Sequence, residues 1–135
     1  MKWMRVHWVE EPRITERVRM KKGEVAASGV EVHIEGFSAT EENVFLFFQN
    51  RTGQSEQKMP DYAEGGKAYA SIPASMTALA GPVRLEIRYL NGEEQHVGRE
   101  VLFYVEGDRM YWDVVEKYES RISALEERVR QLENN

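Results

Sequence analysis

Apolar and polar residues alternate with a period of two through most of the N-terminal part of the chain. The alternation is cleanest at 30–35 and 83–89. Successive side chains of a strand point to opposite faces, so each of these stretches predicts a strand with one buried face. Weaker alternation predicts two more strands at 4–8 and 17–20, separated by Pro12. Helical periodicity is missing from this part of the sequence, which therefore predicts an all-β unit.

Three further segments complete the strand pattern. The apolar run at 44–48 is typical of a central strand covered on both faces, or of one whose outer face meets a partner. A strand is also expected at 67–72, where the pattern leaves open which face is buried. The Asn-Gly pair at 91–92 predicts a hairpin turn, with the return strand running through Val97 and 101–105.

The segments between these strands are rich in turn residues. Glycine and proline recur without periodicity at 51–66, which predicts a long loop, and 73–82 predicts a single helical turn. About six to eight short strands of this kind are typical of an immunoglobulin-like β-sandwich. We expect this sandwich to occupy residues 1–107.

The apolar spacing changes near the C-terminus to alternating steps of four and three, which form a heptad seam. The a positions are Val115, Ile122 and Val129, and the d positions are Tyr111, Tyr118, Leu125 and Leu132. This stripe is too narrow to cover a globular core and fits a partner helix instead. The sequence therefore predicts a coiled coil over 108–135 that holds several copies of the chain together.

Charges beside the seam favour three parallel strands. Arg121 falls at g and Glu126 at the following e, and Arg128 and Glu133 repeat the pair. The segments 121–126 and 128–133 both resemble the Arg-h-x-x-h-Glu signature of short trimeric coiled coils, where h is a hydrophobic residue. Tyrosine at d positions also suits the wide axis of a three-helix coil. β-branched residues at a with leucine at d favour a parallel dimer instead. A single helix packed on its own domain is the other alternative.

Composition is that of a folded protein, with 41% hydrophobic and 30% charged residues among 135. The net charge of -5 argues against a nucleic-acid partner. A local basic run is interpreted as a solvated strand face or an interface to an acidic partner; it comprises Arg13, Arg17, Arg19, Lys21 and Lys22. The lack of cysteine fits synthesis in a reducing cytoplasm, and no apolar stretch predicts a membrane span or a secretion signal.

Catalytic patterns are not found in the sequence. His7, His33 and His96 are isolated and lie outside any metal-ligand spacing, so we interpret them as strand-face residues. Neither a phosphate-binding loop nor a nucleophile elbow is present. We therefore expect no enzymatic activity, no cofactor and no metal.

Tryptophan raises the alternative of a binding protein. We expect Trp8 to lie in the core, and Trp3 and Trp112 to pack where the helix leaves the sandwich. An exposed tryptophan beside the long loop would favour carbohydrate recognition instead. A trimeric module that binds carbohydrate or a host receptor is thus the second interpretation.

The order of elements resembles a known family. The pattern consists of the run 69–73, Met76, the turn at 80–82, the strands at 83–89 and 103–105, and the heptads. This order is similar to that of the N-terminal domain of siphophage baseplate upper proteins. The resemblance covers residues 14 to 133. Such proteins usually continue beyond the coiled coil, whereas this sequence stops at residue 135.

This resemblance implies a structural, non-enzymatic viral protein of the phage tail or baseplate. Members of the family are trimeric and link the baseplate core to receptor-binding proteins. It implies a homotrimer located in the virion and made in the host cytoplasm, with other baseplate or tail proteins as partners. A fibre adaptor of a phage-like particle is the related possibility.

Overall fold

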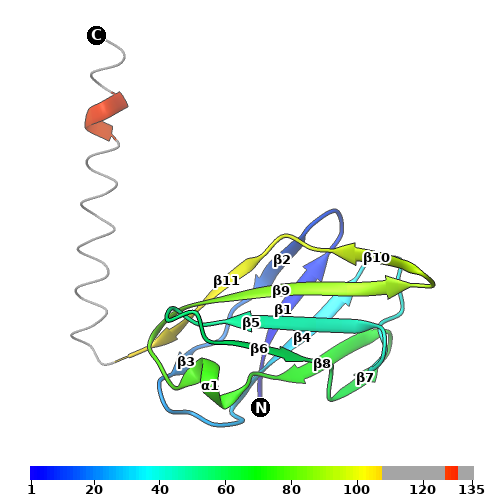
Figure 1. Cartoon of the computed structure of the whole chain (residues 1–135), viewed down its shortest axis with the longest axis horizontal. Coiled ribbons are helices and arrows are strands. Elements are labelled where there is room, and N and C mark those ends of the chain that lie inside the picture. Colours follow the sequence, from blue (N-terminus) through cyan, green and yellow to red (C-terminus); the bar gives the residue numbers. More distant parts are fainter. Residues whose placement is uncertain (108–126, 131–135) are drawn as a thin grey trace.

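The computed structural model describes residues 1–107 and 127–130. Two β-sheets and a short helix make up residues 1–107, and Figure 1 shows the sheets one behind the other. The elements are β1 (Lys2–Trp8), β2 (Pro12–Glu16), β3 (Met20–Lys21), β4 (Ser28–Ile34), β5 (Val44–Gln49), β6 (Ser55–Lys58), β7 (Tyr62–Glu64), β8 (Lys67–Ser71), α1 (Ala74–Thr77), β9 (Gly81–Asn91), β10 (Glu94–Val97) and β11 (Val101–Glu106). The prediction of an all-β unit is confirmed.

The first sheet has the strand order β2-β1-β4-β8-β7, and the second has the order β3-β11-β9-β5-β6. The strand β10 also pairs with β9, beside its C-terminal half. Two neighbouring pairs are parallel, β1 with β4 and β3 with β11. The other pairs are antiparallel, and the Asn-Gly turn between β9 and β10 is the predicted hairpin.

One hydrophobic core lies between the inner faces of the sheets. Alternate residues of each strand enter it, for example Val30, Val32 and Ile34 of β4. The second sheet contributes Leu85 and Ile87 of β9 in the same way. Burial of these apolar surfaces is the main force that holds the sheets together.

Two expectations about the core are confirmed, for Trp8 and for the helical turn, and the open question about the strand at 67–72 is resolved. Trp8 belongs to the core cluster and is only 6% exposed. In β8, Ala68 and Ala70 are buried while Tyr69 lies on the outer face, which resolves the ambiguous pattern there. The helical turn α1 also forms as expected and buries Met76.

The expected strand at 17–20 is wrong. Residues 17–19 have no regular structure, because the chain passes there from β2 in the first sheet to β3 in the second. Pro12, expected to separate two strands, instead begins β2 and pairs with Trp8. The expected loop at 51–66 is also partly wrong, since it contains β6 and β7.

The strands β6 and β7, which the sequence did not predict, both lie at sheet edges. Their side chains are mostly exposed, so they carry no alternation of apolar and polar residues. Hydrogen bonds of the backbone to β5 and β8 hold them in place instead. In the described part of the chain, no helix has the length and apolar character needed to cross a membrane.

Candidate functional site

The end of β11 is the point from which the chain leaves the sandwich. Its last two residues, Val105 and Glu106, pair in parallel with Met20 and Lys21 of β3. The backbone N–H of Lys22 then donates a hydrogen bond of 2.7 Å to the carbonyl oxygen of Glu106. Strand pairing therefore continues to Glu106, the last residue before Gly107.

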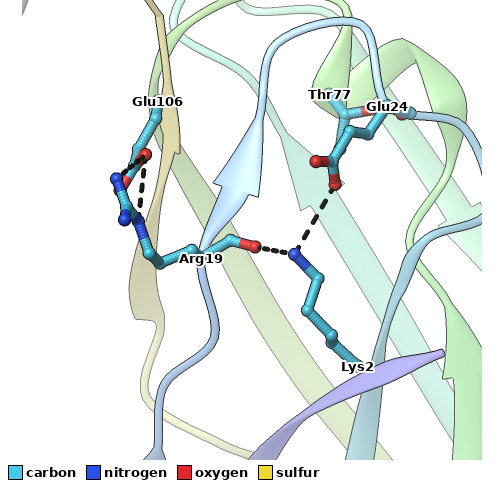
Figure 2. A network of polar contacts seen from close by, with 5 residues as sticks. All are labelled: Lys2, Arg19, Glu24, Thr77 and Glu106. Carbon is cyan, nitrogen blue, oxygen red and sulfur yellow. Dashed lines mark hydrogen bonds and ion pairs between the residues drawn. The ribbon is translucent and has the colours of Figure 1, made fainter.

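Figure 2 shows that side chains also hold this point, which we call the exit clamp (Lys2, Arg19, Glu24, Thr77 and Glu106). The Arg19 guanidinium donates from Nε to Glu106 Oε1 at 3.0 Å and from Nη2 to Oε2 at 2.9 Å. This hydrogen bond lowers the pKa of Glu106 and raises the pKa of Arg19.

The rest of the exit clamp connects three other segments. The Lys2 ammonium donates to the Arg19 carbonyl oxygen and lies 3.7 Å from the Glu24 carboxylate. The Thr77 hydroxyl donates to the Glu24 carbonyl oxygen at 2.6 Å. As a result β1, the 17–24 segment, α1 and the end of β11 form one connected network (Figure 2).

The predicted seam lies mostly outside the described residues. This holds for Tyr111, Val115, Tyr118, Arg121, Ile122, Leu125, Glu126, Leu132 and Glu133, and also for Trp112. The short described stretch 127–130 is helical with all its side chains exposed. It contains Arg128 and Val129, and Val129 is 53% exposed in the single chain. The heptad assignment remains a prediction.

The outer face of the second sheet carries apolar side chains. Leu102 and Tyr104 of β11 are 42% and 41% exposed. Phe45 and Phe47 of β5 are half-buried on the same face, and the Arg88 guanidinium lies 4.6 Å from the centre of the Phe47 ring. This face, defined by these five residues, is a candidate docking surface.

Aromatic rings gather on the outer face of the first sheet. Trp3 of β1 meets Tyr69 of β8 edge-on at 5.2 Å and Tyr62 of β7 at 6.1 Å, and the two tyrosine rings stack at 4.7 Å. Trp3 is half-buried and Tyr62 is 41% exposed. Trp3 thus has partners within the sandwich, while the expected contact with the C-terminal helix lies outside the described residues.

Glu31 of β4 lies next to these rings and is only 8% exposed. The Tyr69 hydroxyl donates to Glu31 Oε1 at 2.9 Å, and Arg5 Nε forms an ion pair with Oε2 at 2.9 Å. Burial, together with the hydrogen bond to Glu31, raises the pKa of Tyr69 to about 12. Lys67 also lies 3.7 Å from Glu31. These partners together compensate the negative charge of the buried Glu31 carboxylate.

Two histidines described as isolated in the sequence are neighbours in the fold. Parallel pairing of β1 with β4 places His7 opposite His33, and their rings stack at 4.7 Å with planes 4° apart. Glu35, which sequence reasoning did not single out, lies 2.9 Å from His7 through Oε2 and Nε2. His96 is elsewhere and stacks on Tyr89 at 4.6 Å. All three histidines lie on strands, as expected, but His7 and His33 are not isolated from each other, and only His96 lies apart.

No protein-family model matches the sequence, and no curated protein is similar to it. Among solved structures, the fold is similar to the N-terminal domain of phage TP901-1 ORF48. The TM-score is 0.47 at 14% sequence identity, with 81% of this chain and 100% of the other chain covered. At this level the likeness carries no conclusion about function.

Proposed function

We propose that this protein is a structural, non-enzymatic assembly protein of a phage-like particle, either a baseplate upper protein or a fibre adaptor. Residues 1–107 act as an immunoglobulin-like sandwich that docks neighbouring subunits, and 108–135 form a parallel three-stranded coiled coil. The observation that carries the proposal is the heptad seam from Tyr111 to Leu132. The phage assignment rests on the resemblance of element order to baseplate upper proteins.

The exit clamp supports the role of a projecting stalk. A coiled coil directs the next component only if the strand before it is held firmly in the domain. The bidentate contact between Arg19 and Glu106 and the backbone bond from Lys22 restrain β11 at its final residue.

Trimerisation would give the docking surface on the second sheet a clear use. Three copies of a weakly binding surface attach strongly when they are held together, because each later contact forms at a high effective concentration. The exposed Leu102 and Tyr104 provide apolar area for such a contact.

The test is the solution mass of the full chain, measured by light scattering over a dilution series. We expect a mass of three protomers. A double substitution, Ile122→Asp/Leu125→Asp, places charges at adjacent a and d positions and should yield monomers that keep their β signal in circular dichroism.

The matched control is Ser120→Asp/Ser123→Asp, which adds the same charge at f and b positions away from the seam. This variant should remain trimeric. A wild-type chain that is monomeric at every concentration would contradict the proposal, as would a seam variant that stays trimeric. A stable mass of two protomers would favour the parallel dimer.

The aromatic cluster of Trp3, Tyr62 and Tyr69 favours a second candidate, a trimeric module that binds carbohydrate or a host receptor. Exposed aromatic rings can stack on sugar faces, and Tyr62 is 41% exposed. Binding of a cell-wall saccharide by the purified chain, lost in Tyr62→Ala, would favour this candidate over the scaffold.

A further inference from the structure

The outer face of the first sheet brings together three side chains that could ligate a metal, two from neighbouring strands and one from the residue after β4. His7 and His33 are opposite each other in the parallel pair β1 and β4, with Trp8 and Ile34 next to them pointing into the core. Glu35 follows β4 directly, and its backbone N–H donates to the Trp8 carbonyl oxygen at 2.8 Å. Regular strand pairing therefore positions all three residues.

Their ligand atoms are close enough to share one ion. One such atom from each of His7, His33 and Glu35 lies within 4.8 Å of the other two. Tetrahedral Zn²⁺ with bonds of about 2.0–2.1 Å separates its ligand atoms by about 3.3 Å. His7 and Glu35 are already 2.9 Å apart, whereas the stacked His7 and His33 rings are nearly parallel, so the two imidazoles must turn toward each other before their nitrogens can face one ion.

We propose that His7, His33 and Glu35 bind a zinc ion, with water as the fourth ligand. Two imidazole nitrogens and one carboxylate oxygen are a donor set that proteins use for Zn²⁺, and hard cations such as Mg²⁺ and Ca²⁺ prefer all-oxygen sets. The site is reachable from solvent, since the His7 side chain is 36% and that of Glu35 is 58% exposed.

A surface hollow lies beside His7, on the side of β1 that faces β2. Its lining includes Glu10 and Glu11 as well as Arg13 and Thr15. An ordinary surface ion pair would need only one imidazole, whereas here a second imidazole is stacked on the first.

Binding would connect β1 and β4 at the centre of the first sheet. Ligands that bind only the folded state raise its stability by mass action. The site does not involve the heptad seam, so it is independent of the proposed trimer.

The experiment is calorimetric titration of the full chain with zinc chloride in a buffer without chelating groups. We expect one ion per chain, and about a ten-fold or larger rise in Kd for His33→Gln and for Glu35→Gln. The matched control is His96→Gln, because His96 has a carboxylate 3.8 Å away on Glu94 but no second imidazole. This control should bind zinc like the wild type.

A second measurement needs no variant of the site. Zinc should shift the imidazole resonances of two of the three histidines in an NMR spectrum of the wild-type chain, and magnesium should shift none. Absence of zinc binding below millimolar concentration would overturn the proposal. So would equal affinity of wild type and His33→Gln, or zinc shifts at His96 alone. Loss of trimerisation would bear on the proposed function and not on this site.

Discussion

At the scale of single residues, Gly29 in β4 shows how a missing side chain positions others. A Cβ atom at this position would lie 2.3 Å from Cζ3 of Trp3 and 2.8 Å from the carbonyl oxygen of Ala70. Glycine therefore allows the Trp3 ring to lie directly on the backbone of β4. The aromatic cluster of Trp3, Tyr62 and Tyr69 depends on this close approach.

Gly29→Ala should destabilise the sandwich. The added methyl group would push Trp3 and the backbone of β8 away, and overpacking of this kind typically costs about 1–3 kcal/mol of unfolding free energy. Urea denaturation of the two proteins measures the difference. The control is Ser28→Ala in the same strand, whose hydroxyl has no hydrogen-bond partner among the described residues, and it should change little. Equal stability of Gly29→Ala and wild type would show that Trp3 does not hold this position.

At the scale of elements, the end of β11 lies between two strands: β9 pairs with it as far as Val105, and the short strand β3 pairs with Val105 and Glu106. The partner strand β3 has only two residues, Met20 and Lys21. Short parallel pairs contribute few backbone hydrogen bonds, so the contact of Arg19 with Glu106 adds a restraint where the ladder ends. This explains why part of the basic run predicted as a solvated or partner-binding face is engaged within the domain.

Glu106→Gln should lower the melting temperature slightly at neutral pH and should matter less in acid. The hydrogen bond from Arg19 lowers the pKa of Glu106 below its ordinary 4.5. A lowered carboxyl pKa stabilises the folded state above the ordinary value, and this contribution disappears as the pH falls through the lowered pKa. The difference between wild type and variant should therefore shrink as the pH falls below about 4.5.

Thermal unfolding followed between pH 7 and pH 3 measures this difference. The control is Glu93→Gln in the exposed turn between β9 and β10, where we expect no effect at either pH. A difference between wild type and Glu106→Gln that stays constant across this range would contradict the role assigned to Arg19.

At the scale of the whole molecule, the described residues of the β-rich part share one hydrophobic core. Its members run from Met4 to Val105, and both sheets contribute to a single cluster. Since burial of apolar surface is the main stabilising force, we expect residues 1–107 to fold without the rest of the chain.

A chain ending at Gly107 should thus fold by itself. We expect the truncated chain to show the same β-type circular dichroism signal as the full chain at the same protein concentration. We also expect one cooperative thermal transition. A truncated chain without cooperative unfolding would contradict the division at residue 107. Its mass should be that of one protomer, because the predicted seam has been removed.

Much of the architecture follows from local pattern. Alternation at 30–35 and 83–89 predicts β4 and β9 because a strand with one buried face must place apolar residues at every second position. The Asn-Gly pair predicts the hairpin of β9 and β10. In the structure Asn91 ends β9 and pairs with Glu94, and Gly92 supplies the positive φ of 66° that the tight turn requires. These features depend only on neighbours in the chain.

Tertiary structure alone decided which strands lie side by side. The parallel register of β1 and β4 joins His7 to His33 across 26 positions, and no spacing rule predicts such a pair. The edge strands β6 and β7 escape prediction because backbone pairing, not burial, holds them. The sequence by itself determined the buried faces of β4 and β9, since periodicity records burial, while the heptad pattern remains a prediction. The neighbours of each strand were decided by the fold, since pairing depends on contacts distant in the chain.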